Sequence, residues 1–277
     1  IILIINLKMK LKTPLVSVII PVYKAHATLA RSLNSIKAQK FDYDKIEIII
    51  SVDDGKSYDE FKKLFQNIKI INPSGKIMTG AGQARNRGIR KARGKLIGFL
   101  DADDTWSPTY LKELAPIACR FGVAISKTEI LNHLGEYIHL LDPGLNIQIK
   151  HFGLLPGSFH PLVIKKFAGP FPDGPSQDVI HAMRLLKKIK YRYKLPLNAK
   201  YQLWLNNNSK TADKKFCKLV DNSYKNWRYY YLKKMDFERN SSNQEIIKTL
   251  QLKINWNNSY INSKNKKSFY NFLNEKF

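Results

Sequence analysis

Two acidic clusters in the chain have the residue types and spacing that metal-assisted chemistry uses. Asp53-Asp54-Gly55 and Asp101-Ala102-Asp103-Asp104 each follow directly on a run of apolar residues. Two carboxylates one residue apart can share a hard divalent cation such as Mg²⁺ or Mn²⁺, which takes its remaining ligands from phosphate oxygens. A diphosphate bridged in this way is a better leaving group, because the cation offsets the charge that develops on it.

The apolar runs before these clusters predict strands that are buried on both faces. Val16–Val22 and Ile46–Val52 are continuous and rich in β-branched residues, which is typical of inner strands of a parallel sheet. Residues 95–100 form a similar run that ends at the second cluster, and Ile68–Ile71 is a shorter one. Helices are predicted between the strands over residues 27–39, 58–66 and 80–92 and from Ser107-Pro108 onward.

This alternation predicts an α/β fold with a doubly wound, mostly parallel sheet flanked by helices. Ligands of such sheets bind where the carboxyl ends of the strands meet. Both acidic clusters and a third motif, Pro21-Val22-Tyr23, fall at such ends. An isolated Asp-x-Asp is more simply explained as a cap of backbone amides in a turn. Acidic clusters after two strands of one sheet are less common, so their convergence favours a ligand site.

The motifs, taken in order, resemble those of the family 2 glycosyltransferases of the GT-A fold. The matching segments are VSVIIPVY at 16–23, IIISVDDG at 48–55, ARNRGI at 84–89 and GFLDADD at 98–104. The resemblance is strong over residues 14–115 and continues more weakly through Gly169-Pro170-Phe171 and Gln177-Asp178 to about residue 209. It implies an inverting, metal-dependent enzyme that moves a sugar from a nucleotide-sugar, a UDP-sugar, to an acceptor hydroxyl.

The resemblance also implies roles for individual residues. Those expected to bind the nucleotide-sugar are Pro21, Val22, Tyr23, Asp53, Asp54, Arg85, Asp101 and Asp103. Arg85 would lie near the diphosphate, which a guanidinium is well suited to bind, and Asp101 and Asp103 would hold the divalent cation. Asp178 matches the acidic position that serves as the catalytic base. The usual acidic pair is reduced there to Gln177-Asp178, which leaves the one carboxylate that a base needs.

Several of these residues also have a purely structural explanation. Tyr23 could pack as an ordinary aromatic side chain. Asp54 could cap the turn that follows it, and Asp178 could be the N-cap of its own helix. The arginines that follow Arg85 are assigned to a solvated helix face: Arg87, Arg90 and Arg93. The six histidines are scattered, and the sequence assigns a role to none of them.

Charge and composition limit the classes of protein and of partner. The 277 residues carry a net charge of +25, and residues 181–277 hold 22 of the 47 basic residues but only 6 of the 22 acidic ones. Such a surface attracts polyanions such as phospholipid head groups, nucleic acid or acidic glycans, although a solvated lysine face is the simpler alternative. The 44% hydrophobic content excludes disorder over most of the length. Two cysteines exclude a disulfide framework, which favours a cytoplasmic location.

The chain divides into three segments on these patterns. Residues 13–209 are expected to form the GT-A domain, with a nucleotide-binding part at 13–122 and an acceptor part at 123–209. Residues 210–277 are predicted to be a small basic helical appendage, because apolar residues recur there at helical spacing: Tyr224, Trp227, Tyr231 and Met235, then Ile246, Leu250 and Ile254. Residues 1–12 are expected to be a disordered extension with translation starting at Met9, the alternative being a short anchor at a membrane interface.

We therefore expect glycosyl transfer to a growing bacterial surface glycan or its lipid carrier. The partners would be a nucleotide-sugar donor, a glycan or lipid-linked acceptor, and the anionic inner face of the cell membrane. A catalytically silent nucleotide-sugar binder or a nucleotidyltransferase is one alternative, and a basic nucleic-acid-binding protein is another. Nucleic acid is the poorer partner, because it does not explain acidic clusters that repel phosphate unless a cation intervenes.

Overall fold

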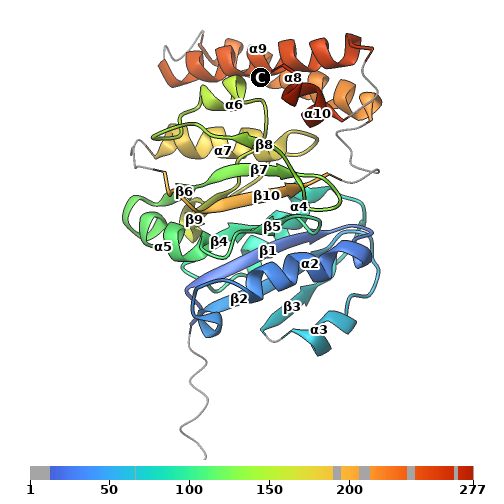
Figure 1. Ribbon diagram of the computed structural model, residues 1–277, viewed down its shortest axis with the longest axis vertical. Helices are drawn as coiled ribbons and strands as arrows, with labels where there is room; N and C mark the ends of the chain where they lie inside the picture. The colour runs from blue at the N-terminus through green and yellow to red at the C-terminus, as the bar shows by residue number, and fades with distance from the viewer. Residues whose placement is uncertain are drawn as a thin grey trace, which may run out of the picture.

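The computed structural model describes residues 13–65, 67–189, 195–205, 213–235, 241–264 and 268–276. The extension expected over residues 1–12 therefore lies outside the described residues. The described chain is layered, with a larger sheet, a smaller sheet and a pair of long helices following one another along the long axis of the molecule (Figure 1).

The larger sheet contains the four strands that the apolar runs predicted. Its strand order is β3-β2-β1-β4-β9-β6, in which β3, β2, β1 and β4 run parallel and β9 is antiparallel to both neighbours. The strands are β1 (Val16–Val22), β2 (Ile46–Val52), β3 (Ile68–Ile71), β4 (Leu96–Phe99), β6 (Val123–Ile125) and β9 (Pro161–Ile164). Every residue of β2 and β4 is buried, so the sheet is covered on both faces, as continuous apolar runs predict.

The helices before residue 190 follow the predicted order, with differences at their ends. They are α2 (His26–Lys37), α3 (Glu60–Leu64), α4 (Ala81–Lys91), α5 (Tyr110–Phe121), α6 (His151–Leu154) and α7 (Gln177–Lys188), with 3-10 turns at Tyr43–Lys45 and Lys165–Phe167. α5 begins at Tyr110 and not at Ser107-Pro108. The Ser107 hydroxyl accepts the main-chain N–H of Lys200 at 2.9 Å instead of capping the helix.

A second, four-stranded sheet lies beside the first, with the order β5-β10-β7-β8. Its strands are β5 (Thr105–Trp106), β7 (Lys127–Leu131), β8 (Tyr137–Leu141) and β10 (Lys200–Trp204). Residues 123–131 are split between the two sheets, with β6 in the larger sheet and β7 in the smaller one. The break is at Ser126, whose hydroxyl accepts the N–H of Tyr201 at 3.1 Å and donates to the carbonyl of Lys127 at 2.9 Å. These bonds hold the chain at the change of sheet.

The acidic loop at 101–104 connects the two sheets, because it leaves β4 and enters β5. Asp104 is buried and accepts hydrogen bonds from Tyr201 Oη at 2.7 Å and from the N–H of Trp204 at 2.9 Å, both on β10. Burial raises the pKa of Asp104 well above its ordinary value, and the nearby Asp103 and Asp101 raise it further. Asp104 is therefore a structural residue that fastens the loop to the second sheet.

The C-terminal region is helical in its described parts, as predicted. It contains α8 (Lys214–Met235), α9 (Ser241–Asn262) and α10 (Phe269–Asn274), and α8 and α9 lie side by side (Figure 1). The side chains of Ile246, Leu250 and Ile254 are buried, as their spacing predicts. α9 packs against α6, and α10 packs against β8. Within the described residues, no helix has the length and apolar character needed to cross a bilayer.

Glu47 connects three elements at the end of the larger sheet that is opposite to the acidic clusters. Its buried carboxylate accepts hydrogen bonds from Ser17 Oγ at 2.6 Å and from the main-chain N–H and the Nε of Arg93, both at 2.9 Å. Burial alone would raise the pKa of Glu47, but these donors hold it below its ordinary value. The carboxylate thus ties β1 and β2 to the turn before β4.

We expect Glu47→Gln to lower the free energy of unfolding by about 1–3 kcal/mol at pH 7, because it replaces charge-assisted hydrogen bonds with weaker ones. A carboxyl whose pKa is lower in the folded protein stabilises it above the unfolded-state value of about 4.3. That stabilisation is lost as the pH falls through the folded-state pKa, so the difference between variant and wild type should shrink below about pH 4. Urea denaturation at both pH values measures it. Glu60→Gln, on the exposed α3, is the control, and an equal difference at both pH values would contradict the assignment.

Candidate active site

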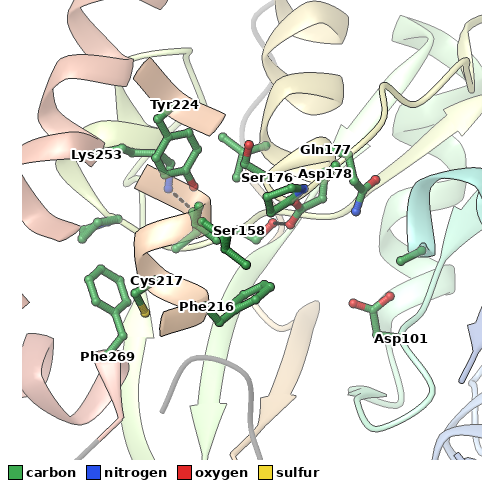
Figure 2. Close-up of a pocket in the computed structure, with 18 of the residues that line it drawn as sticks. Asp101, Ser158, Ser176, Gln177, Asp178, Phe216, Cys217, Tyr224, Lys253 and Phe269 are labelled. Carbon is green, nitrogen blue, oxygen red and sulfur yellow. Dashed lines mark hydrogen bonds between the residues drawn. The ribbon is translucent and has the colours of Figure 1, made fainter. Parts of the chain in front are cut away.

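The carboxyl ends of β1, β2 and β4 meet at two adjoining pockets. The first has a volume of about 310 Å³ and is lined by Pro21, Val22, Tyr23, Asp53, Met78, Gly80 and Ala81. The second has a volume of about 450 Å³ and is lined by Arg85, Asp101 and Asp178. Figure 2 shows Asp101 and Asp178. Gly80 and Ala81 at the N-terminus of α4 line both pockets, so the pockets meet there.

Seven of the nine predicted site residues therefore lie in one connected region, and Asp54 and Asp103 line neither pocket. Asp54 has the contacts of a capping residue, because it accepts the N–H groups of Lys24 at 2.7 Å and Lys56 at 3.0 Å. Asp103 receives a hydrogen bond at its main-chain oxygen from Arg31 Nη2 at 2.7 Å. The predicted nucleotide contact of Asp54 and the predicted metal contact of Asp103 stay predictions.

Asp53 anchors the N-terminus of α4 beside the first pocket. Its carboxylate accepts hydrogen bonds from Thr79 Oγ1 at 2.5 Å, the N–H of Gly80 at 2.7 Å and Arg87 Nη2 at 2.8 Å. Burial alone would raise the pKa of this carboxyl, but these donors hold it below its ordinary value. The Arg87 side chain is only 13% exposed, so its assignment to a solvated helix face was wrong. The buried carboxylate holds the guanidinium inward, whereas Arg90 and Arg93 are exposed.

Tyr23 lies at the mouth of the first pocket and is 43% exposed, so it is not a core aromatic residue. Its hydroxyl lies 3.4 Å from Sδ of Met78, which lines the same pocket. A planar ring at the rim of a pocket of this size can stack against a nucleobase. The predicted nucleoside contact of Tyr23 stays a prediction.

Arg85 is the central charged group of the second pocket. Its side chain is almost fully buried, and its Nη2 forms an ion pair with Asp101 Oδ1. Burial alone would lower the pKa of Arg85, but Asp101 and Asp178 raise it, so the guanidinium stays charged. Among the described residues, neither its Nε nor its Nη1 finds a hydrogen-bond acceptor. Two unsatisfied donors on a buried cation indicate a place for an anion.

His160 lies beside Asp101 and was given no role by the sequence. Its ring stacks on Tyr201 with centroids 4.2 Å apart, and its Nε2 is 3.8 Å from Asp101 Oδ2, too far for a hydrogen bond. Neither ring nitrogen has a hydrogen-bond partner in the described part of the chain. Burial lowers the pKa of His160, so the ring is neutral at pH 7. It reaches the end of β4 because β9 pairs antiparallel with β4, which no sequence pattern revealed.

Asp178 lies in the first turn of α7 and faces the second pocket (Figure 2). Ser158 Oγ donates a hydrogen bond to its Oδ2. Burial alone would raise the pKa of Asp178, but His160, Ser158 and Arg85 hold it below its ordinary value. Ser176, and not Asp178, occupies the N-cap position. Asp178 is therefore an ionised carboxylate in a pocket, which is the state that a base requires.

The surroundings of Asp101 offer a divalent cation only a few ligands from the protein. In the part of the chain that the structure describes, no three His, Cys, Asp or Glu side chains are grouped to hold a metal ion. The side chains near Arg85 that could bind a metal ion are the Asp101 carboxylate and the ring of His160, whose nitrogens have no hydrogen-bond partner among the described residues. Mg²⁺ is commonly bound by one or two carboxylates, with water and substrate phosphates as its other ligands. The residues present fit a cation that is shared with a bound diphosphate.

The C-terminal helices form the side of the second pocket that is opposite to Asp101. Phe216, Cys217 and Tyr224 come from α8, Lys253 from α9 and Phe269 from α10 (Figure 2). This wall is mostly apolar and aromatic, and it starts next to Asp178. The sequence indicated a helical appendage here but gave no sign that its side chains enter the site, because helical spacing identifies buried faces and not what covers them.

Comparisons with known proteins identify the family of the first half of the chain. Residues 17–152 match the family model described as glycosyl transferase family 2. UDP-Glc:alpha-D-GlcNAc-diphosphoundecaprenol beta-1,3-glucosyltransferase WfgD of Escherichia coli is 37% identical over 146 residues, which cover 50% of this chain and 57% of that protein. The chain thus spans little more than half the length of this relative, and 30% and 32% of two others, from Bacillus subtilis and Nostoc.

Two solved structures are similar in fold. The crystal structure of S. aureus TarS 1-349 in complex with UDP-GlcNAc has a TM-score of 0.54 and 16% identity, and it covers 76% of this chain and 66% of that one. Mannosyltransferase PcManGT from Pyrobaculum calidifontis, in complex with GDP-Man and Mn²⁺, has a TM-score of 0.59 and 13% identity, and it covers 90% and 72%. At these identities the likeness concerns the fold alone, and it confirms the predicted GT-A type α/β fold.

Proposed function

Because the chain belongs to glycosyl transferase family 2, we propose that it moves a sugar from a nucleotide-sugar to an acceptor hydroxyl, with inversion at the anomeric carbon. One observation supports this proposal: Tyr23 and Asp53 line the first pocket, and Arg85, Asp101 and Asp178 line the adjoining second pocket. A nucleoside, a diphosphate and a sugar with its acceptor would follow one another in this order along the pockets.

The nucleoside, a uridine on this proposal, occupies the first pocket, with Pro21 and Val22 along its side and the ring of Tyr23 at its rim. The diphosphate lies where the two pockets meet, at the N-terminus of α4, which has no side-chain cap. Backbone N–H groups at such a terminus favour an anion. The unsatisfied Nε and Nη1 of Arg85 supply charge-assisted donors next to it.

A divalent cation would be held by Asp101 and Asp103, which the sequence predicts as its ligands. Bound there, the cation would offset the negative charge that develops on the departing diphosphate. Support comes from the Mn²⁺ in the complex of the P. calidifontis mannosyltransferase and from the fit of the residues around Asp101. Arg85, which pairs with Asp101, would offset the same charge.

Asp178 is the proposed base. Its ionised carboxylate takes the proton of the acceptor hydroxyl, and the oxygen then forms a bond with the anomeric carbon. The bond from that carbon to the nucleoside diphosphate breaks on the opposite face, and the bonding electron pair leaves with the diphosphate. The lowered pKa of Asp178 keeps it ionised at neutral pH, although it also makes the carboxylate a weaker base.

The acceptor would be a bacterial surface glycan or its lipid-linked precursor, and it would lie between Asp178 and the C-terminal helices. The name of the E. coli relative supports the lipid-linked class, since it specifies an undecaprenol-linked acceptor. A basic groove between α7 and α8, lined by Arg184, Lys187, Lys188, Tyr230, Tyr231 and Lys234, suits contact with an anionic membrane that carries such an acceptor.

Asp178→Asn should lower transfer by about 10²–10⁴-fold, the usual contribution of a general base. The measurement is UDP release from UDP-glucose with α-D-GlcNAc-diphosphoundecaprenol as the acceptor probe. UDP affinity and melting temperature should change little, because Asn keeps the shape and can still accept the Ser158 hydroxyl. Asp173→Asn, an exposed neighbour, is the matched control. Near-normal transfer by Asp178→Asn would reject Asp178 as the base. A loss of transfer in Asp173→Asn would then identify Asp173 as the alternative.

Removal of divalent cations by EDTA should abolish donor turnover, and added Mn²⁺ or Mg²⁺ should restore it. Asp103→Ala should have the same effect as EDTA and should not respond to added metal, while its melting temperature stays close to that of the wild type. Asp42→Ala, which changes an exposed acidic residue before β2, is the control. A wild-type rate that EDTA leaves unchanged would show that the metal role of Asp101 and Asp103 is wrong.

The protein should bind vesicles that contain anionic lipid, and binding should weaken as salt screens charges over roughly 8–10 Å. Lys187→Gln, Lys188→Gln and Lys234→Gln together should weaken it roughly a hundredfold, since each lysine near an anionic surface contributes about 1 kcal/mol. The same three-charge change at the exposed Lys37, Lys40 and Lys63 should have a smaller effect. Equal binding to neutral and anionic vesicles would defeat the membrane contact, and tighter binding to duplex DNA would favour a nucleic-acid partner.

A further inference from the structure

Lys253 is a buried lysine in the second pocket that the proposed mechanism does not use. It lies on α9, only 4% of it is exposed, and it lines the pocket close to Tyr224 (Figure 2). Among the residues that the structure describes, no carboxylate forms a salt bridge with it. Burial of an ammonium group is costly unless the group is hydrogen-bonded and its charge is used.

The contacts of Lys253 lead toward the base. Its Nζ donates a hydrogen bond to the main-chain oxygen of Gly157 at 3.0 Å and lies 5.4 Å from the centroid of the Tyr224 ring. Gly157 precedes Ser158, whose hydroxyl donates to Asp178 Oδ2. Lys253 is thus connected to the Asp178 carboxylate through a single loop.

That loop is fixed from more than one side. Thr128 Oγ1, on β7, donates to the main-chain oxygen of Ser158 at 3.0 Å. A Cβ atom at Gly157 would collide with the side chain of Leu141 of β8, so the loop packs closely against this strand. The smaller sheet therefore supports one side of the loop, and Lys253 supports it from the C-terminal helices.

We infer that Lys253 is a positioning residue for the base: it holds the Gly157 carbonyl so that the Ser158 hydroxyl stays directed at the Asp178 carboxylate. This inference rests on the proposed function in one respect, the role of Asp178. It makes α9, which lies outside the segment that matches the family model, a working part of the site.

The charge of Lys253 also favours the ionised form of Asp178, in addition to the hydrogen bond that holds the Gly157 carbonyl. Burial lowers the pKa of Lys253 to about 8, and the Asp178 carboxylate opposes that shift. The interaction is reciprocal, so the ammonium favours the ionised form of Asp178. The other charged or titratable groups that act on Asp178 are Arg85 on α4, His160 before β9, His181 on α7, Tyr224 on α8 and Tyr270 on α10.

The test compares Lys253→Met with Lys248→Met, which removes an exposed lysine from the same helix. With UDP-glucose and α-D-GlcNAc-diphosphoundecaprenol, Lys253→Met should lower kcat by up to about 100-fold, the cost of a small misplacement in a site. Its UDP affinity should match the wild type. The acidic limb of its pH–rate profile should move to higher pH, because the ionised carboxylate loses both a charge partner and a well-directed donor. Lys253→Arg, which keeps the charge and a donor, should restore part of kcat and the position of the limb.

A merely structural role would lower the melting temperature of Lys253→Met and leave the limb where it is, and that result would overturn the inference. If Lys253→Met does not fold, Lys253→Gln serves as the test. Glutamine removes the positive charge but keeps a polar side chain at this position. Carbon-13 NMR of labelled aspartate, with Asp178 assigned by its absence in Asp178→Asn, reports the carboxyl pKa without turnover. An inactive wild type would therefore reject the proposed function alone, whereas an unshifted Asp178 pKa in Lys253→Met would reject the role of Lys253.

Discussion

The burial of one guanidinium, that of Arg85, constrains the arrangement of the whole site. An ion in the protein interior costs several kcal/mol unless opposite charges and hydrogen-bond partners come to it. Asp101 reaches Arg85 from the end of β4, and Asp178 acts on it from the first turn of α7. The elements that carry these three residues must therefore keep their relative places. Two donors of Arg85, its Nε and Nη1, stay unsatisfied in the described structure, so they can bind an anion.

The carboxylates of the two pockets show how environment divides one residue type between structure and chemistry. Asp104 is buried, is bonded to Tyr201 and Trp204, and has a raised pKa, so it joins the two sheets. Asp178 is partly exposed, and its neighbours lower its pKa and keep it charged. The pKa of Asp53 is also lowered, and its carboxylate binds the N–H of Gly80 at the N-terminus of α4. Local sequence could not distinguish these roles, because the deciding partners come from residues 79–87 and 158–204.

The sequence predicted the parts of the fold and the site that depend on local pattern. Continuous apolar runs located β1, β2 and β4, and motifs at their ends located Tyr23, Asp53 and Asp101. Contacts between distant segments could not be predicted from local sequence patterns. His160 comes near Asp101 because β9 is antiparallel to β4, and Arg87 turns inward because Asp53 is buried there. Ser158 and Lys253 are polar residues without a motif, and they reach the site only when the loop before β9 meets α9.

The second pocket is built from two stretches of chain, and only one of them lies within the segment that matches the family model. Arg85 and Asp101 lie within residues 17–152, the part shared with the family, whereas Asp178 and the aromatic wall lie beyond it. Residues from both sides of position 152, where the match to the family model ends, therefore line the same cavity. Substitutions that accumulate in α8–α10 can therefore reshape the space opposite Arg85 without disturbing β1, β2 or β4. On the proposed function, the part of the cavity that would receive the acceptor can change in sequence independently of the part that would hold the donor.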